Sequence, residues 1–237
     1  TKYLTSSNAW KNCPDAGIAP DNSLLSVVGQ SLVLGKPDSN ATYGWDNEYG
    51  QLPVDVSDFS ASQYLVSNQE FMQFVDAGGY QTTSYWSEEG QSWLEFSKSE
   101  MPRFWRRKNG QYWQRNLTEE IPLPLNWPVE DNFLEAKAFC NWKDSSSDDF
   151  VRLPTEAEWQ VLRDQLDTDL SDWSQAPGNI NLEHFASSCP VDKFKQTEFY
   201  DVIGNVWQWS ESPIDGYEGF KVHPLYDDFS TPTFDGQ

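Results

Sequence analysis

The 237-residue chain has two histidines, and they limit the metal chemistry that it can hold. His184 and His223 could join a carboxylate such as Asp227 in the two-histidine, one-carboxylate set of non-haem iron oxygenases. Nothing in their spacing favours that set, and His223 stands beside Pro224, as a loop residue would. We therefore expect no metal site within the chain.

Cys13, Cys140 and Cys189 are the candidate nucleophiles. They are widely spaced, so they form neither the Cys-x-x-Cys pair of a redox or zinc site nor the even set of a disulfide framework. Cys140 falls on the apolar face of a predicted helix, which favours a core position. The pattern predicts free thiols and a cytoplasmic location.

The run Asp46–Glu48 combines two carboxylates with an amide and could ligate calcium. Consecutive side chains reach one ion only where the loop curves sharply. We therefore favour a structural role, in which these side chains hold a loop by hydrogen bonds with Trp45 as its anchor.

The net charge of −21, from 37 acidic and 16 basic residues, argues against nucleic acid and anionic membranes as partners. One basic run, Arg103–Lys108, interleaves cations with aromatic rings and could stack on single strands. We interpret it as a charged loop that covers a Trp-rich core and pairs with local acids. No apolar run approaches the roughly 18 residues of a membrane helix.

Three helices are predicted to position these groups. They begin at Ser67, near Asp131 and at Thr155, and the first and third begin with the spacing of a capping box. Ser26–Leu34 predicts two short strands around Gly29. The aromatic stretch 85–127 predicts packed loops and short strands.

A Gly-Asn corner followed by two tryptophans is the most distinctive local pattern. Gly204 and Asn205 adopt positive φ readily, so they predict a tight turn. Trp207 and Trp209 would then share one face of a short core strand. With 36 aromatic residues in the chain, we expect a core of large rings in an α+β domain spanning 25–237, preceded by an irregular interdomain linker at 1–24.

Four ordered blocks resemble the formylglycine-generating-enzyme, or sulfatase-modifying-factor, domain family: Val66–Tyr80, Pro122–Trp142, Arg152–Trp159 and Gly204–Trp209. The resemblance implies a C-type-lectin-like fold with a twisted antiparallel sheet, two main helices and much irregular structure. The family's later Gly-Gly-Ser-Trp and arginine blocks are not in the chain. We therefore expect a C-terminally incomplete fragment that lacks its final strands.

Two family activities need residues that can be checked in the chain. Formylglycine generation relies on a close cysteine pair, which is not found, so an oxidase of that type is disfavoured. Some members bind calcium, and Asn205 could belong to such a site. Gln208 stands where the family often has Glu, which lowers the charge available to a cation, and the calcium interpretation stays open.

Two further segments resemble sulfoxide synthases of thiol-histidine biosynthesis. Tyr43–Gly50 is similar to their Gly-Trp-Asp-Asn-Glu signature, and Ser212–Phe229 is similar to the ovothiol branch, the 5-histidylcysteine sulfoxide synthases. The resemblance implies joining of cysteine to histidine with dioxygen at a mononuclear non-haem iron(II). The iron ligands would lie outside this chain, on an N-terminal DinB-like domain, and a methyltransferase domain would follow. This chain would wall the substrate pocket and be inactive alone.

The resemblance implies one catalytic residue in this chain. Tyr226 would face the iron-bound substrates, where a phenol can donate a proton or hydrogen bond; Tyr217 is the second candidate. Tyr226 could instead be one more packed ring. No substrate-binding residue is predicted, and a non-catalytic lectin-like binding module or a scaffold remains an alternative function.

Overall fold

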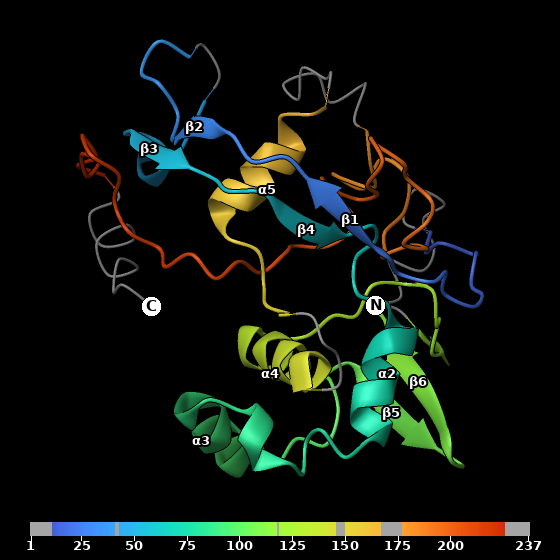
Figure 1. The fold of residues 1–237 in the computed structure, drawn as a ribbon. Coiled ribbons are helices and arrows are strands. Elements are labelled where there is room, and N and C mark those ends of the chain that lie inside the picture. The colour runs from blue at the N-terminus through green and yellow to red at the C-terminus, as the bar shows by residue number, and fades with distance from the viewer. Residues whose placement is uncertain (1–10, 41–42, 118, 146–149, 167–176, 226–237) are drawn as a thin grey trace. The chain divides into compact units, whose positions relative to one another are not determined.

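The computed structural model describes residues 11–40, 43–117, 119–145, 150–166 and 177–225. Helices and small antiparallel sheets alternate with long irregular segments, as Figure 1 shows, and the predicted α+β class is confirmed. The chain divides into two compact units. The first comprises 1–24, 62–153 and 173–209, and the second comprises 25–61, 154–172 and 210–237.

The first unit contains three α-helices and one 3₁₀ turn among its described residues: α2 (Asn68–Asp76), η2 (Thr83–Tyr85), α3 (Glu88–Ser97) and α4 (Phe133–Ser145). Ser67 caps α2 by accepting a hydrogen bond from the Glu70 amide, and the Glu70 carboxylate accepts one from the Ser67 amide. The predicted capping box is therefore confirmed. The second predicted helix is also confirmed as α4. Helix α3 falls in the stretch that predicts loops and strands.

Helix α3 presents a narrow apolar face, on which Trp93 and Leu94 are partly buried against the core of the first unit. Gly90 is its one buried residue, and Phe96 on the same helix is 89% exposed. Its start is fixed locally, because the Ser87 hydroxyl accepts a hydrogen bond from the Gly90 amide. The helix therefore depends on its cap and on packing against α4 as well as on this narrow face.

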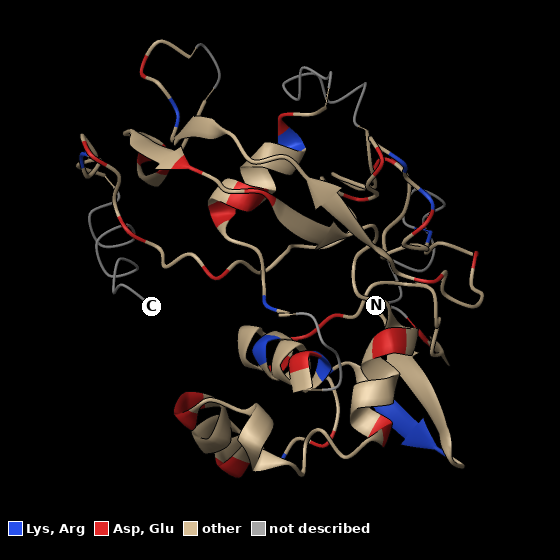
Figure 2. Ribbon diagram, in the orientation of Figure 1, with Lys and Arg blue, Asp and Glu red and all other residues tan. Residues whose placement is uncertain are grey.

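A three-stranded antiparallel sheet completes the first unit: β5 (Trp105–Lys108), β6 (Gln111–Arg115) and β7 (Glu120–Pro122), in that order. The basic run forms a turn at residues 103–104 and then strand β5, which is blue in Figure 2, so the expected loop is wrong for residues 105–108. The expected pairing with acids is confirmed, since Arg107 lies 3.5 Å from Asp76 and Lys108 pairs with Glu120.

Large rings form the core of the first unit, as the composition predicts. Phe71 and Phe74 of α2 are fully buried, and the Phe71 ring stacks on Phe139 of α4 with centroids 5.3 Å apart. Trp86 and Trp105 close the cluster. Fully burying one such ring contributes about 1.5–3 kcal/mol, so α2 and α4 are held together by this cluster.

The described residues of the second unit form four short strands, one 3₁₀ turn and one α-helix: β1 (Leu24–Val27), β2 (Ser31–Leu34), η1 (Asp46–Glu48), β3 (Leu52–Asp55), β4 (Phe59–Ser62) and α5 (Glu156–Arg163). Strand β1 pairs with β4, and β2 pairs with β3 in a register that sets Ser31 opposite Asp55. The break at Gly29 between the two predicted strands is confirmed. A Cβ at Gly29 would lie 2.1 Å from the Val56 carbonyl oxygen, so only glycine fits.

The three cysteines are buried free thiols, as expected. Cys13 and Cys189 pack with the fully buried Trp127 in a second cluster of the first unit. Burial and the nearby Asp201 carboxyl raise the pKa of the Cys189 thiol to about 12, so it stays protonated and is a poor nucleophile. The boundary at residue 24 and the linker role of 1–24 stay predictions.

The helices of the described part of the chain are all too short or too polar to cross a membrane.

Candidate functional site

The N-terminus of α5 lies in the Arg152–Trp159 block and is bonded to a segment far along the chain. Thr155 and Glu158 form the predicted capping box, in which each side chain accepts a hydrogen bond from the other's backbone amide. Backbone groups beside the cap form hydrogen bonds with that distant segment. The Glu156 amide donates to the Ser212 hydroxyl over 2.9 Å, and the Glu211 amide donates to the Pro154 carbonyl over 2.8 Å.

Tyr217 continues this attachment between α5 and the segment that follows Ser212. Its hydroxyl donates a hydrogen bond to the Glu156 carboxylate over 2.6 Å. Burial and that carboxylate raise the pKa of Tyr217 well above its usual range, so the phenol stays protonated. The structure therefore engages the hydroxyl of Tyr217, the second catalytic candidate, in a structural bond.

The loop 43–50 is held by the hydrogen bonds predicted for Asp46–Glu48. The Glu48 carboxylate accepts from the Trp45 amide over 2.8 Å, and the Asp46 carboxylate accepts from the His223 amide over 2.9 Å. Both acids are thus used by backbone donors, as the structural interpretation expects. Trp45 is 47% exposed and packs edge-on against Tyr43, and its role as the anchor of the loop stays a prediction.

The loop 43–50 and the segment 212–225 also meet backbone to backbone. The Gln51 amide donates to the Glu218 carbonyl over 2.9 Å. Gly50 has φ of 115°, and a Cβ there would lie 2.7 Å from the Tyr217 Cβ. Two segments about 170 residues apart in sequence are therefore in close contact within the second unit.

Tyr226 and Asp227 lie outside the described residues. The chain leading to them is described as far as Leu225, whose amide donates to the His223 ring nitrogen Nδ1 over 3.2 Å. The attachment of His223 to Asp46 therefore fixes the segment three residues before Tyr226. The catalytic role of Tyr226 stays a prediction.

The described residues do not fit an iron site of their own. His184 is exposed in the first unit, with its ring 4.9 Å from that of Phe194, and His223 is exposed in the second. Among the described ranges, no three His, Cys, Asp or Glu side chains come together as a metal would require. Within the described part of the chain, neither histidine therefore belongs to such a group.

The Gly-Asn corner is confirmed, but the predicted core strand after it is wrong. Gly204 and Asn205 have φ of 96° and 64°, while Trp207 is fully exposed and Trp209 is 48% exposed. The backbone at 206–209 pairs with no described strand. Instead, the Gln208 side chain donates to the Asp201 carbonyl over 2.8 Å, which bends the segment back on itself.

Both polar atoms of the Asn205 side chain form hydrogen bonds with other groups of the protein. Its Oδ1 accepts from the Cys189 amide over 2.9 Å and from the Cys189 thiol over 3.5 Å. Its Nδ2 donates to the Cys189 carbonyl and to the Asp201 carboxylate. Because both lone pairs of Oδ1 are occupied, the calcium interpretation has no donor at Asn205.

Sequence reasoning missed two acids at the start of α4, the buried Glu135 and the half-buried Asp131. Glu135 is 2% exposed; it accepts from the Tyr80 hydroxyl and from the Asn132 amide. Burial raises the pKa of the neighbouring Asp131 well above its usual range, and the Glu135 carboxyl raises it further. The Asn132–Glu135 spacing is that of a capping box and could have revealed the group, since the Asn132 side chain accepts from the Glu135 amide.

Comparisons with known proteins agree with this geometry. The family described as "Sulfatase-modifying factor enzyme 1-like domain" matches residues 20–224. The chain is 27% identical to the "Hercynine oxygenase" of Mycobacterium tuberculosis over 86% of this chain and 49% of that protein. It is 24% identical to the "Ergothioneine biosynthesis protein 1" of Schizosaccharomyces pombe over 99% of this chain and 29% of that protein.

The fold is also found among solved structures. The "Structure of PvdO from Pseudomonas aeruginosa" superposes with a TM-score of 0.53 at 15% sequence identity, over 90% of this chain and 81% of that one. The chain spans about half the length of the hercynine oxygenases that it matches. With the family match covering most of its length, the chain belongs to the sulfatase-modifying factor enzyme 1-like domain family and has that family's α+β fold.

Proposed function

We propose that this chain is a domain of a non-haem iron(II) sulfoxide synthase that joins cysteine to histidine with dioxygen in ovothiol biosynthesis. The domain walls the substrate pocket of the enzyme. A DinB-like domain supplies the iron ligands, and a methyltransferase domain acts on the product. Family membership and the likeness to hercynine oxygenases support the reaction class.

One structural observation carries the proposal for this chain. The two segments that resemble sulfoxide synthases, 43–50 and 212–225, are bonded to each other through Asp46 and His223 and through Gln51 and Glu218. If each segment were only a structural turn, there would be no reason for both of them to resemble the same enzymes. Their contact forms one surface, from which the chain continues into Tyr226.

The residues of this chain would then bind and orient the substrates and supply a proton, and iron held by the other domain would supply the chemistry with dioxygen. Tyr226 donates a proton to an oxygen atom that develops negative charge. The overall reaction balances with one C–S bond formed, one oxygen atom placed on sulfur and the second released as water. The hydrogens of that water come from the thiol and from the imidazole carbon.

A substrate comparison tests the proposal. The polypeptide encoded by the complete reading frame around this chain is incubated with iron(II), cysteine and air, with either histidine or hercynine as the acceptor. Mass spectrometry of the product is expected to show the sulfoxide with histidine at the higher rate. A preference for hercynine would place the enzyme with its ergothioneine relatives, and no sulfoxide from either acceptor would reject the reaction.

A non-catalytic lectin-like binding module is the second candidate, because Trp207 lies fully exposed beside an open pocket. Catalysis by the complete polypeptide separates the two, since a binding module would give no sulfoxide with either acceptor.

A further inference from the structure

An open pocket of about 730 Å³ lies within the first unit, on the side of the Gly-Asn corner. This volume is in the range of small-molecule sites. The residues that line it include the acids Glu130 and Asp131, the hydroxyl residue Ser188, the amide residue Asn205 and the indoles Trp207 and Trp209. Among the residues described as lining it, none is Lys, Arg or His.

The two indoles give the pocket an aromatic rim. Trp207 is fully exposed, so its ring faces are open to a ligand. Trp209 is held in place by a hydrogen bond of 3.3 Å from its indole nitrogen to the Asp131 carbonyl and by an edge-on contact with Phe133. The face of an indole attracts cations more strongly than other aromatic faces do.

Two acids, Glu130 and Asp131, line the pocket. Glu130 is held by the Ser188 hydroxyl, which donates to its carboxylate over 2.8 Å. Asp131 lies beside Glu135, whose two oxygens already accept from Tyr80 and from the Asn132 amide. Glu135 is therefore occupied and does not line the pocket, whereas Asp131 and Glu130 do.

The opposite wall is fixed before any ligand arrives. The Asn179 amide joins two points of the wall, because it donates to the Ser187 carbonyl over 2.9 Å and accepts from the Phe185 amide over 3.2 Å. Asn205 is fixed in the same way by Cys189. A wall that is already ordered loses less conformational entropy when a ligand binds.

We propose that this pocket binds a small organic ammonium cation, with Trp207 and Trp209 against its apolar surface and Asp131 and Glu130 as its counter-charges. An anion would meet two acids and no cation, and the chain as a whole carries a charge of −21. The site uses residues of the first unit alone and does not depend on the sulfoxide synthase reaction. The proposed binding would therefore occur even if the protein catalysed no reaction.

The test uses a neutral molecule of nearly the same shape. The ¹⁵N-labelled 1–237 chain is titrated with choline, with ethanolamine and with 3,3-dimethylbutan-1-ol, which replaces the charged nitrogen of choline by carbon. The indole N–H signals of Trp207 and Trp209 are assigned with Trp207→Phe and Trp209→Phe. We expect saturable shifts with a cation and about 10-fold weaker binding of the neutral alcohol. Whichever of choline and ethanolamine binds with the higher affinity shows whether the site prefers a quaternary or a primary ammonium group.

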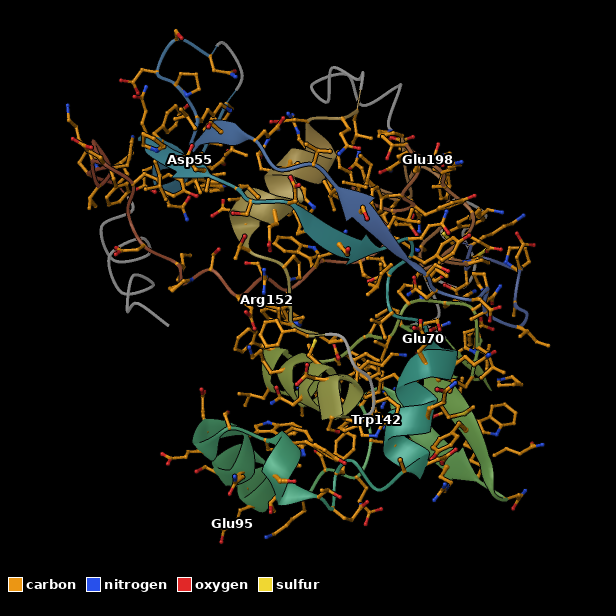
Figure 3. All side chains as sticks on the ribbon, viewed as in Figure 1. Asp55, Glu70, Glu95, Trp142, Arg152 and Glu198 are labelled. Carbon is orange, nitrogen blue, oxygen red and sulfur yellow. The ribbon has the colours of Figure 1, made fainter. Side chains whose placement is uncertain are left out.

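Variants separate the site from a general charge effect. Trp207→Ala removes a fully exposed ring, so the fold is kept, and it should weaken binding about 5-fold. Asp131→Asn should weaken it about 10-fold. Glu95→Gln is the matched control, because Glu95 lies exposed on α3, as Figure 3 shows, and its loss should leave the affinity unchanged.

Three results would overturn the proposal: equal binding of choline and the alcohol, no saturation by either cation, or equal weakening by Glu95→Gln and Asp131→Asn.

Discussion

Asn205 donates a hydrogen bond over 2.9 Å to the fully buried carboxylate of Asp201, and both residues have left-handed backbone, with φ of 64° and 48°. The other carboxylate oxygen of Asp201, Oδ1, has no hydrogen-bond partner among the described residues. One amide therefore holds a buried acid, a cysteine backbone and the corner that carries the two exposed tryptophans.

Asn205→Ala should destabilise the protein by about 3 kcal/mol, because it leaves buried polar groups unpaired and places alanine at positive φ. Asn181→Ala is the control. Asn181 is exposed with φ of 52°, so its replacement tests the backbone effect alone, at about 1 kcal/mol. Urea denaturation measures both variants, and equal losses would show that the side-chain bonds of Asn205 contribute nothing.

Stability should fall as pH rises, because of Asp201. Burial raises the pKa of this carboxyl to about 7, against the pull of its bond from Asn205. The folded chain therefore holds a proton that the unfolded chain has lost, so stability decreases between about pH 4 and pH 7. The loss is on the order of 4 kcal/mol for a shift of this size.

Asp201→Asn should remove that part of the pH dependence, because an amide keeps the shape and does not ionise. Denaturation curves at several pH values compare its slope with that of the parent chain. A slope unchanged by the substitution would mean that Asp201 is already ionised in the folded protein.

Gly50→Ala should destabilise the second unit more than Gly110→Ala does. Both glycines have positive φ, at 115° and 79°, so both variants bear the backbone cost of about 1 kcal/mol. A Cβ at Gly50 also meets Tyr217, whereas one at Gly110 has nothing within 4 Å. We expect an extra loss of about 2 kcal/mol at Gly50, measured by thermal or urea denaturation. Equal losses would mean that the loop and the segment 212–225 do not stay in contact.

Tyr226→Phe should shift the complete enzyme from sulfoxide formation toward simple oxidation of the cysteine thiol, because the proton donor is lost. Tyr217→Phe is the matched control, since the Tyr217 hydroxyl is engaged with Glu156. Chromatography of the two products gives the ratio. An unchanged ratio in Tyr226→Phe, or the same change in Tyr217→Phe, would remove Tyr226 from the chemistry.

Binding of choline to the pocket of the first unit should strengthen as pH rises above the ordinary carboxyl range. Burial raises the pKa of Asp131, and the acids nearest to it are Glu130 and Glu135, with Tyr80 beyond. A bound cation favours the ionised form of Asp131, so binding releases a proton. Calorimetry in buffers of different ionisation enthalpy measures that proton, and Asp131→Asn should release none.

Helices with capping boxes and the corner at Gly204 could be predicted, because each depends on a few neighbouring residues. Ser67 and Thr155 cap their helices as their spacing predicts, and Gly204 has the positive φ that its type favours. Neighbouring residues alone could not decide whether the segment after the corner forms a core strand. Whether Trp207 is buried depends on what packs against it, and alternation alone does not contain that information.

The same limit applies to the residues of the candidate site, where local patterns could be predicted and contacts between distant segments could not. The loop at Asp46–Glu48 and the segment after Ser212 could each be identified from sequence, but their contact could not, because it joins backbone groups about 170 residues apart. The acids at Asp131 and Glu135 were missed for a similar reason. Their unusual pKa values come from burial, and burial is a property of the folded chain.

The most direct test of the central claim compares two proteins in one assay. The 1–237 chain and the complete polypeptide that contains it are each loaded with iron(II), and bound iron and sulfoxide from cysteine, histidine and dioxygen are measured together. We predict stoichiometric iron and sulfoxide in the complete polypeptide and neither in the 1–237 chain. Stoichiometric iron and sulfoxide from the 1–237 chain alone would contradict the claim that it walls the pocket while another domain holds the metal.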